Sequence, residues 1–321
     1  MTRIAILGAG SWGTALSVVL SRARKPHEIS LWARNAELAE TLQRQRENTV
    51  YLKGVRLLDG IRATHDMAKA IASAQIVIGA MPSVHARAVY AQALPSITKE
   101  MVFVSATKGL EPETHLRMSL VLAQVLAKAG AAEPSRRIAV LSGPSFAAEA
   151  ARGEPTAVVL AAQDPSLSAL LQEELSGPTF RLYTNDDVLG VELAGAMKNV
   201  IAIAAGACRG LGLGSNPLAA LITRGLAEMM RLAAALGARP ETLSGLAGLG
   251  DLVLTCTGAL SRNRHVGMEL GKGRRLLEVL AEMRMVAEGV DKKRLFTSPI
   301  FSLSTKVLVA VARRPGLLVP P

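Results

Sequence analysis

The start of the chain carries a glycine pattern that is typical of a dinucleotide-binding turn. Gly8, Gly10 and Gly13 follow the apolar run at residues 3–7 and precede a helical pattern. At such a junction the first glycine permits a tight turn, the second lets the backbone approach a pyrophosphate, and the third allows a helix to pack closely on a strand. The start of the helix also offers unpaired N–H groups to an anion. We therefore expect NAD or NADP to bind here.

The end of the second expected strand indicates which dinucleotide is preferred. About 20 residues beyond such glycines, NAD-binding proteins place an acidic residue that holds the ribose 2′-hydroxyl. Here the strand at residues 29–32 leads to Arg34, with no acid at its tip. Because a guanidinium pairs well with a 2′-phosphate, we expect NADP(H) to be accepted and preferred, with NAD(H) as the second cofactor. The alternative is that Arg34 is an ordinary solvated arginine.

Lys198 lies within residues 191–207, a stretch so apolar on every face that it predicts a buried helix. Its neighbours on the same face include Ala194 and Gly195, which leave room for a pocket. A buried ammonium must meet an anion or lose its proton, and burial lowers the pKa of lysine. The pattern thus predicts a lysine that exchanges a proton near neutral pH. The alternative is a lysine whose head group reaches the surface.

Two loops after expected strands carry groups that suit an anion. Residues 105–109 contain Lys108, and residues 142–147 contain Gly143 and Ser145. Ligands of open α/β sheets bind at the carboxyl ends of the strands, so we expect the ammonium and the glycine–serine loop to share one crevice. Each loop on its own could be an ordinary connection.

Two further segments combine glycines, charge and a helix start. Residues 245–251 are too rich in glycine for an ordinary helix and end at Asp251, so we expect close approach of the backbone to another group. Residues 261–263, Ser-Arg-Asn, then suit a terminal phosphate, because they combine a capping hydroxyl, unpaired N–H groups and a guanidinium. The alternative is a capped surface helix.

The elements that must position these groups follow from the alternation of apolar runs with helical patterns. This alternation predicts a parallel sheet covered by helices. The expected strands are residues 3–7, 29–32, 76–79, 101–105, 138–142, 156–161 and 180–183. The expected helices between them are residues 13–23, 37–46, 84–93, 113–129 and 166–175.

Beyond about residue 186 the strand patterns end and long Ala/Leu-rich helices follow. We expect Asn216 to cap the helix that ends near residue 236. The predicted fold class is therefore α/β, with a Rossmann-type dinucleotide-binding domain at residues 1–187 followed by an all-α substrate-binding domain at residues 188–321.

Composition excludes several other classes of protein. Two cysteines and five scattered histidines in 321 residues predict neither a disulfide scaffold nor a metal site. Of the net charge of +11, six positive charges fall in residues 292–321, and aromatic residues make up 3%, so nucleic-acid binding is not expected. The apolar run after Arg3 is broken by glycines, which argues against a signal peptide. No membrane insertion and a cytoplasmic location are expected.

Together these motifs resemble the bacterial-type NAD(P)-dependent glycerol-3-phosphate dehydrogenases. The resemblance implies reversible reduction of dihydroxyacetone phosphate to sn-glycerol 3-phosphate, a supply of glycerol phosphate for phospholipid synthesis, and a homodimer. The matching stretches lie in order between residues 8 and 290: 8–16, 106–111, 141–147, 193–199, 220–228, 245–258 and 286–290.

The resemblance also implies roles residue by residue. It makes Lys198 the proton donor and acceptor, while we expect Lys108 to stabilise developing charge and Asp251 to orient Lys198 or bind a substrate hydroxyl. Beside the three glycines, the implied cofactor contacts are Ser11, Trp12, Arg34, Lys108, Ala147, Arg262, Val286 and Glu288. The implied substrate contacts are Lys108, Gly143, Ser145, Lys198, Asp251, Ser261, Arg262 and Asn263.

The sequence departs from the family pattern in two places. Arg209 stands where an acidic residue is usual, and residues 291–321 do not continue the pattern, with Pro299 and the closing prolines interrupting helix formation. Three alternatives remain open. The first is a dehydrogenase of the same architecture but another substrate, such as a β-hydroxyacid dehydrogenase, which should lack the phosphate nest at residues 261–263. The others are a non-enzymatic NADP sensor and a nucleic-acid protein that uses the basic tail.

Overall fold

The computed structural model describes residues 1–283. It divides into two compact units, the first comprising Met1–Val188 and the second beginning at Leu189.

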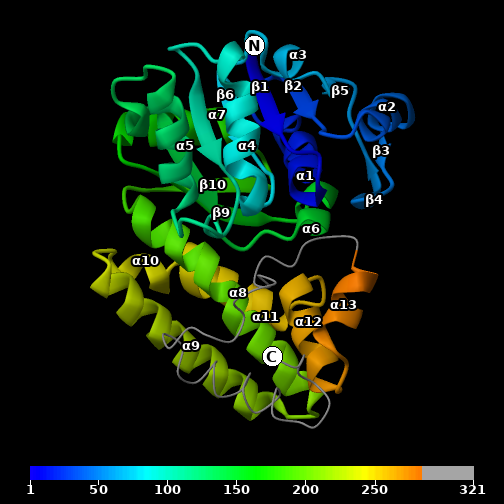
Figure 1. Ribbon diagram of the computed structural model, residues 1–321, viewed down its shortest axis with the longest axis vertical. Coiled ribbons are helices and arrows are strands. Elements are labelled where there is room, and N and C mark those ends of the chain that lie inside the picture. Colours follow the sequence, from blue (N-terminus) through cyan, green and yellow to red (C-terminus); the bar gives the residue numbers. More distant parts are fainter. Residues whose placement is uncertain (284–321) are drawn as a thin grey trace. The chain divides into compact units, whose positions relative to one another are not determined.

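The first unit is built on a sheet that has eight strands within the described residues (Figure 1). In spatial order these are β10 (Phe180–Asn185), β9 (Thr156–Ala162), β8 (Ile138–Ser142), β7 (Val102–Ser105), β6 (Ile76–Gly79), β1 (Thr2–Leu7), β2 (His27–Trp32) and β5 (Ile61–Thr64). The strand order reverses between β1 and β6, which is where sheets of this kind bind nucleotides. All seven strands predicted from apolar runs are present.

The strands do not all run in the same direction. β9 pairs with β8 in the antiparallel sense, with Leu141 opposite Leu160, while β10 is parallel to β9. The expectation of a wholly parallel sheet was therefore wrong at this edge. A continuous apolar run shows that a strand is buried on both faces, but it carries no information on direction.

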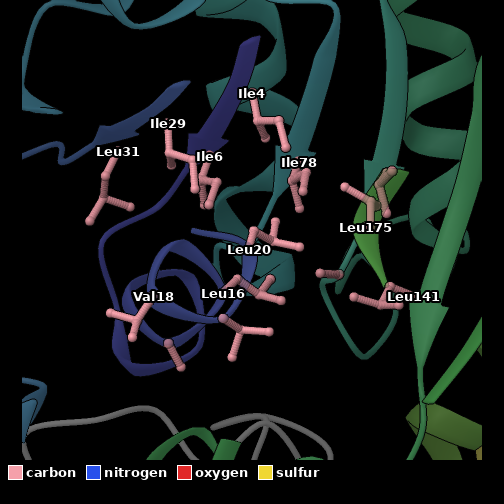
Figure 2. Packing of buried hydrophobic residues seen from close by; sticks show 14 of the residues in the cluster. Ile4, Ile6, Leu16, Val18, Leu20, Ile29, Leu31, Ile78, Leu141 and Leu175 are labelled. Carbon is pink, nitrogen blue, oxygen red and sulfur yellow. The ribbon is translucent and has the colours of Figure 1, made fainter. Parts of the chain in front are cut away.

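Helices cover both faces of the sheet because successive side chains of a strand point to opposite sides. Ile4 and Ile6 belong to one apolar cluster, whereas Ala5 and Leu7 belong to the other. Figure 2 shows Ile4 and Ile6 with Leu16 in the first of these clusters. The first face is covered by α1 (Ser11–Leu20), α2 (Ala36–Gln45), α6 (Ala147–Arg152) and α7 (Pro165–Leu175). The second is covered by α3 (Met67–Ile71), α4 (Ser83–Ala93) and α5 (Met118–Lys128).

Several local features were not expected from the sequence. A two-stranded hairpin of β3 (Glu47–Asn48) and β4 (Leu52–Arg56) follows α2, and 3₁₀ turns lie at Leu94–Ser96 and Pro134–Arg137. The helix expected over residues 113–129 begins only at Met118. Residues 110–117 instead form a turn, in which Leu110 bridges to Arg117.

The second unit is helical. Its described elements are α8 (Val188–Gly210), α9 (Ser215–Ala235), α10 (Pro240–Ser244), a π-helical turn (Leu246–Gly250), α11 (Asp251–Thr257), α12 (Arg262–Gly271) and α13 (Leu276–Glu282). α9 begins at Ser215, and its N-cap residue is Gly214, so Asn216 lies inside the first turn of the helix. The predicted cap at Asn216 was therefore wrong.

α8 is the central helix of this second core. By length and composition it could cross a membrane, but 83% of its most apolar window is buried inside the protein. Ile201, Ala202 and Ile203 are fully buried among the other helices, so packing accounts for the apolar composition.

Glycine allows α8 and α12 to approach very closely. A Cβ atom on Gly267 of α12 would lie 1.8 Å from the carbonyl oxygen of Ile203 on α8. This crossing brings the first turn of α12 beside the part of α8 that carries Asn199.

Candidate active site

The glycine turn of the first unit has the geometry that its sequence predicts. Gly8 has φ +120°, and its N–H donates a hydrogen bond to the carbonyl of Trp32. A Cβ atom on Gly13 would lie 1.8 Å from the Gly8 carbonyl oxygen, so only glycine lets α1 start this close to β1. A Cβ on Gly10 would meet nothing within 4 Å, and the turn is therefore open at Gly10.

The hairpin of β3 and β4 holds this turn in place through hydrogen bonds that were not predicted from the sequence. The amide nitrogen of the fully buried Asn48 donates hydrogen bonds to the carbonyl of Ala9 (3.0 Å) and the hydroxyl of Thr14 (2.8 Å). The Ser11 hydroxyl donates to the carbonyl of Tyr51, 2.6 Å away, and the Tyr51 N–H donates to the Asn48 side chain. No local pattern marks these residues, because their partners lie 34–40 positions earlier in the chain.

The residues at this turn fit a dinucleotide. α1 begins at Ser11, its N-cap Gly10 makes no side-chain cap, and Trp12 is half-buried in the first turn. Arg34 follows β2 and is exposed, so its guanidinium is accessible to a ligand. An open helix start beside an exposed arginine suits a pyrophosphate and a second phosphate.

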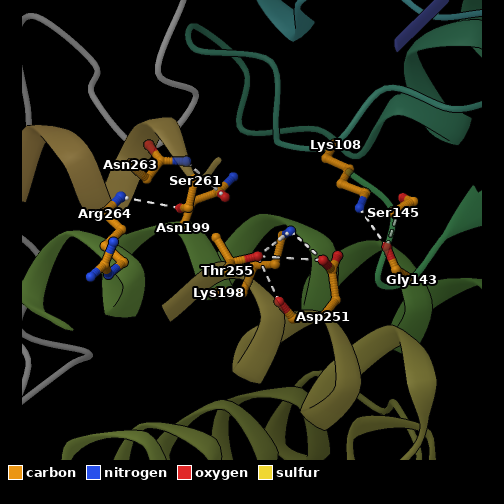
Figure 3. Close-up of polar contacts among 10 residues, drawn as sticks. All are labelled: Lys108, Gly143, Ser145, Lys198, Asn199, Asp251, Thr255, Ser261, Asn263 and Arg264. Carbon is orange, nitrogen blue, oxygen red and sulfur yellow. Dashed lines mark hydrogen bonds and ion pairs between the residues drawn. The ribbon is translucent and has the colours of Figure 1, made fainter. Parts of the chain in front are cut away.

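The two anion loops predicted from the sequence lie together at the carboxyl ends of β7 and β8. The Lys108 ammonium and the Ser145 hydroxyl both donate to the carbonyl of Gly143, at 2.8 and 2.9 Å (Figure 3). Ala147 is the first residue of α6, which starts directly after this loop. The structure thus brings together Lys108, Gly143 and Ser145.

In the second unit, Lys198 is buried and ion-paired. Its side chain is 7% exposed, and Nζ lies 2.6 Å from Oδ1 of Asp251, whose side chain is 1% exposed. Nζ also donates to the hydroxyl of Thr255 at 2.8 Å, and that hydroxyl donates to the backbone carbonyl of Asp251 (Figure 3). The alternative of a lysine reaching the surface is wrong within this unit.

The pair explains how a charge can be tolerated in an apolar helix. We expected burial to favour the neutral amine, but the adjacent carboxylate favours the ammonium and opposes that effect. Thr255 was missed, although it follows Asp251 by four residues and so lies on the same face of α11. The glycine-rich segment before Asp251 forms the π-helical turn, where a Cβ on Gly248 would lie 2.0 Å from the Leu243 carbonyl.

Cys256 also lies in this core but has the properties of a packing residue. Burial raises the pKa of its thiol to about 12, although the positive charges of Lys198 and Arg264 partly oppose that rise. The thiol is therefore protonated at neutral pH and is a poor nucleophile.

The predicted phosphate nest begins α12. The Ser261 hydroxyl accepts a hydrogen bond from the N–H of Arg264, as a helix cap does. The side chain of Asn263 donates to that of Asn199 on α8 at 3.0 Å, and Arg262 is half-buried. Val286, Glu288 and the segment 291–321 lie outside the described residues.

Comparison with known proteins identifies the family. Residues 3–168 match the model for the N-terminal part of NAD-dependent glycerol-3-phosphate dehydrogenase, and residues 187–305 match that for its C-terminal part. The chain belongs to this family. The match continues to residue 305, beyond the limit near 290 that the motifs indicated.

Individual members of the family are closely similar along nearly their whole length. The glycerol-3-phosphate dehydrogenase [NAD(P)+] of Koribacter versatilis is 49% identical over all 321 residues, which cover 90% of that protein. The protein of the same name from Geobacter sp. strain M21 is 52% identical over 95% of this chain and 88% of its own length.

Solved structures agree with this assignment. The crystal structure of glycerol-3-phosphate dehydrogenase from Coxiella burnetii has a TM-score of 0.83 at 39% identity, covering 99% of this chain and 91% of the other. A D-mandelate dehydrogenase shares the fold alone, with a TM-score of 0.57 at 14% identity. The similarity to this family is thus far greater than to D-mandelate dehydrogenase.

Proposed function

We propose that this protein catalyses the reversible, NAD(P)-dependent reduction of dihydroxyacetone phosphate to sn-glycerol 3-phosphate. The observation that carries the proposal is the buried Lys198–Asp251 pair, in a chain 49% identical over its full length to a glycerol-3-phosphate dehydrogenase [NAD(P)+]. We further propose that the product supplies glycerophospholipid synthesis, and that the protein acts in the cytoplasm as a homodimer.

The chemistry needs a hydride at C2 of the ketone and a proton at its oxygen. A bound nicotinamide supplies the hydride. Lys198 donates the proton to the ketone oxygen as negative charge develops there, and in the reverse direction it accepts the proton from the hydroxyl. Asp251 and Thr255 hold the lysine nitrogen in place, since both lie within 2.8 Å of it.

The remaining site residues bind and orient. Gly8, Gly10, Ser11, Trp12 and Gly13 bind the pyrophosphate, and Arg34 selects the 2′-phosphate of NADP(H). Lys108, Gly143 and Ser145 contribute positive charge and hydrogen bonds toward the substrate. Lys108 and Ala147 also contact the cofactor. The start of α12, with Ser261, Arg262 and Asn263, holds the substrate phosphate away from the reacting carbon.

The test is the loss of NADPH absorbance when the purified protein is given dihydroxyacetone phosphate. We expect rapid oxidation with this ketone and little with unphosphorylated dihydroxyacetone, because the latter lacks the group that the α12 start would bind. Equal use of both ketones would contradict the phosphate site. Oxidation of NADPH with another ketone, such as a keto acid, but not with dihydroxyacetone phosphate would contradict the proposed function itself.

A further inference from the structure

The loop that carries Lys108 is fixed on both sides of the lysine. Before it, the Thr107 hydroxyl donates a hydrogen bond to the carbonyl of Met81, 2.7 Å away. After it, Glu111 is bound by Arg87 of α4. Because only two residues separate Lys108 from Glu111, the place of the carboxylate restricts where the lysine backbone can lie.

The contact between Arg87 and Glu111 is bidentate. Nε of Arg87 donates to Oε1 of Glu111 and Nη2 donates to Oε2, each at 2.7 Å. Nη2 also donates to the side chain of Gln124 on α5 at 2.9 Å, and the Thr114 hydroxyl donates to Glu111. The Glu111 side chain is only 11% exposed. The pair thus joins two helices to the loop, unlike an isolated surface ion pair, which contributes little.

The backbone beyond Lys108 forms a closed turn around the same carboxylate. The Glu111 N–H donates to the carbonyl of Leu116, and the His115 N–H donates to the carbonyl of Glu111, both at 2.9 Å. Gly109 has φ +117°, and a Cβ atom there would lie 3.3 Å from the Ser83 hydroxyl at the start of α4. α4 therefore approaches the loop at two places: Ser83 leaves little room for a side chain at position 109, and Arg87 binds Glu111.

Charge favours the same arrangement. The Arg87 guanidinium holds the pKa of the Glu111 carboxyl below its usual range, and burial opposes this only in part. The Glu111 carboxylate is thus ionised at neutral pH. With the loop held in this way, the Lys108 ammonium lies 2.8 Å from the Gly143 carbonyl.

We propose that Arg87 and Glu111 are positioning residues, whose ion pair holds the Lys108 loop so that the ammonium stays beside Gly143 and Ser145. The consequence for turnover rests on the proposed function, because that function gives Lys108 its role. The residues themselves need not touch substrate or cofactor.

The test compares the variants R87K and E111Q with the wild type. Lysine keeps the charge of Arg87 but loses the two-pronged contact, and glutamine keeps the shape of Glu111 but loses its charge. We expect kcat/KM for dihydroxyacetone phosphate to fall about tenfold to a hundredfold, mainly through KM, because the ammonium is misplaced. The matched control is R152K, which alters the exposed pair of Arg152 with Glu154 and should change kcat/KM less than about twofold.

A second measurement separates positioning from a merely structural role. The dissociation constant for NADPH is followed through tryptophan fluorescence in wild-type and K108M backgrounds, with the thermal midpoint recorded for each variant. If Arg87 acts through Lys108, R87K weakens binding in the wild-type background and has no further effect in K108M. Equal effects in both backgrounds, or a lowered thermal midpoint with unchanged KM and affinity, would overturn the inference.

The two proposals fail in different ways. A wild-type protein that does not reduce dihydroxyacetone phosphate contradicts the proposed function, while the NADPH arm still decides the role of Arg87. A wild-type protein that reduces the ketone, with R87K and E111Q indistinguishable from it, contradicts only the positioning role.

Discussion

In the proposed mechanism, the chemistry depends on the contact between Lys198 and Asp251. A buried ion pair contributes little net stability, because the desolvation of both charges offsets their attraction. Under the proposed function, the value of the pair is that it holds a proton donor at a fixed place, not that it stabilises the fold. The apolar helix and the lysine within it could be predicted from the sequence. Thr255 could not, since a threonine four residues after an aspartate is too common a pattern to single out.

Arg34 is the residue that should set cofactor preference. Arg34→Ala should raise KM for NADPH about tenfold, the usual effect of losing one charge-assisted hydrogen bond, and leave KM for NADH nearly unchanged. Steady-state kinetics with both cofactors measure this, and Arg44→Ala on α2 is a control of the same charge. Equal effects on both cofactors would remove Arg34 from 2′-phosphate recognition, as would a wild type that uses NADH at least tenfold more efficiently.

At the scale of elements, the sequence predicts best what is buried. Central strands such as β1 and β6 are continuous apolar runs, and each was found within about a residue of its predicted ends. β4 and β5 were missed because they are short, and Lys53, Gly54 and Arg62 interrupt their apolar pattern. The direction of β9 could not be predicted either, because it depends on how the chain folds back after β8.

The turn at residues 110–117 shows the same limit and leads to a prediction on pH. Its residues resemble the start of a helix, but the turn is held by its own hydrogen bonds and by Arg87, which lies far away in the sequence. Folding lowers the pKa of the Glu111 carboxyl. The stability that the carboxylate contributes is therefore fully present above the pKa of glutamate in the unfolded chain, about 4.5, and is lost as the pH falls through the lower pKa of the folded protein.

Urea unfolding at a series of pH values measures this contribution. From pH 7 to about pH 5, the free energy of unfolding of the wild type should exceed that of Glu111→Gln by about 1 kcal/mol. This difference should vanish as the pH falls below the range in which carboxyl groups ordinarily titrate. A difference that persists unchanged at pH 3, or one that grows there, would show that the carboxylate charge is not what stabilises the turn.

At the scale of the whole molecule, two units with separate apolar cores carry different groups of the proposed site. The first holds the glycine turn and the Lys108 loop, and the second holds Lys198 and the start of α12. Loss of the lysine should therefore slow turnover strongly without weakening the nucleotide site. Family resemblance in the motifs was confirmed by matches to both halves of the dehydrogenase.

The most direct test is turnover by Lys198→Met, with the double variant Lys198→Met/Asp251→Asn included because the single change leaves a buried carboxylate without its partner. We predict that kcat for dihydroxyacetone phosphate falls about 10²–10⁴-fold in both variants, the usual contribution of a positioned general acid, while the dissociation constant for NADPH stays within about twofold of the wild type. Turnover at the wild-type rate in either variant would contradict the role of Lys198.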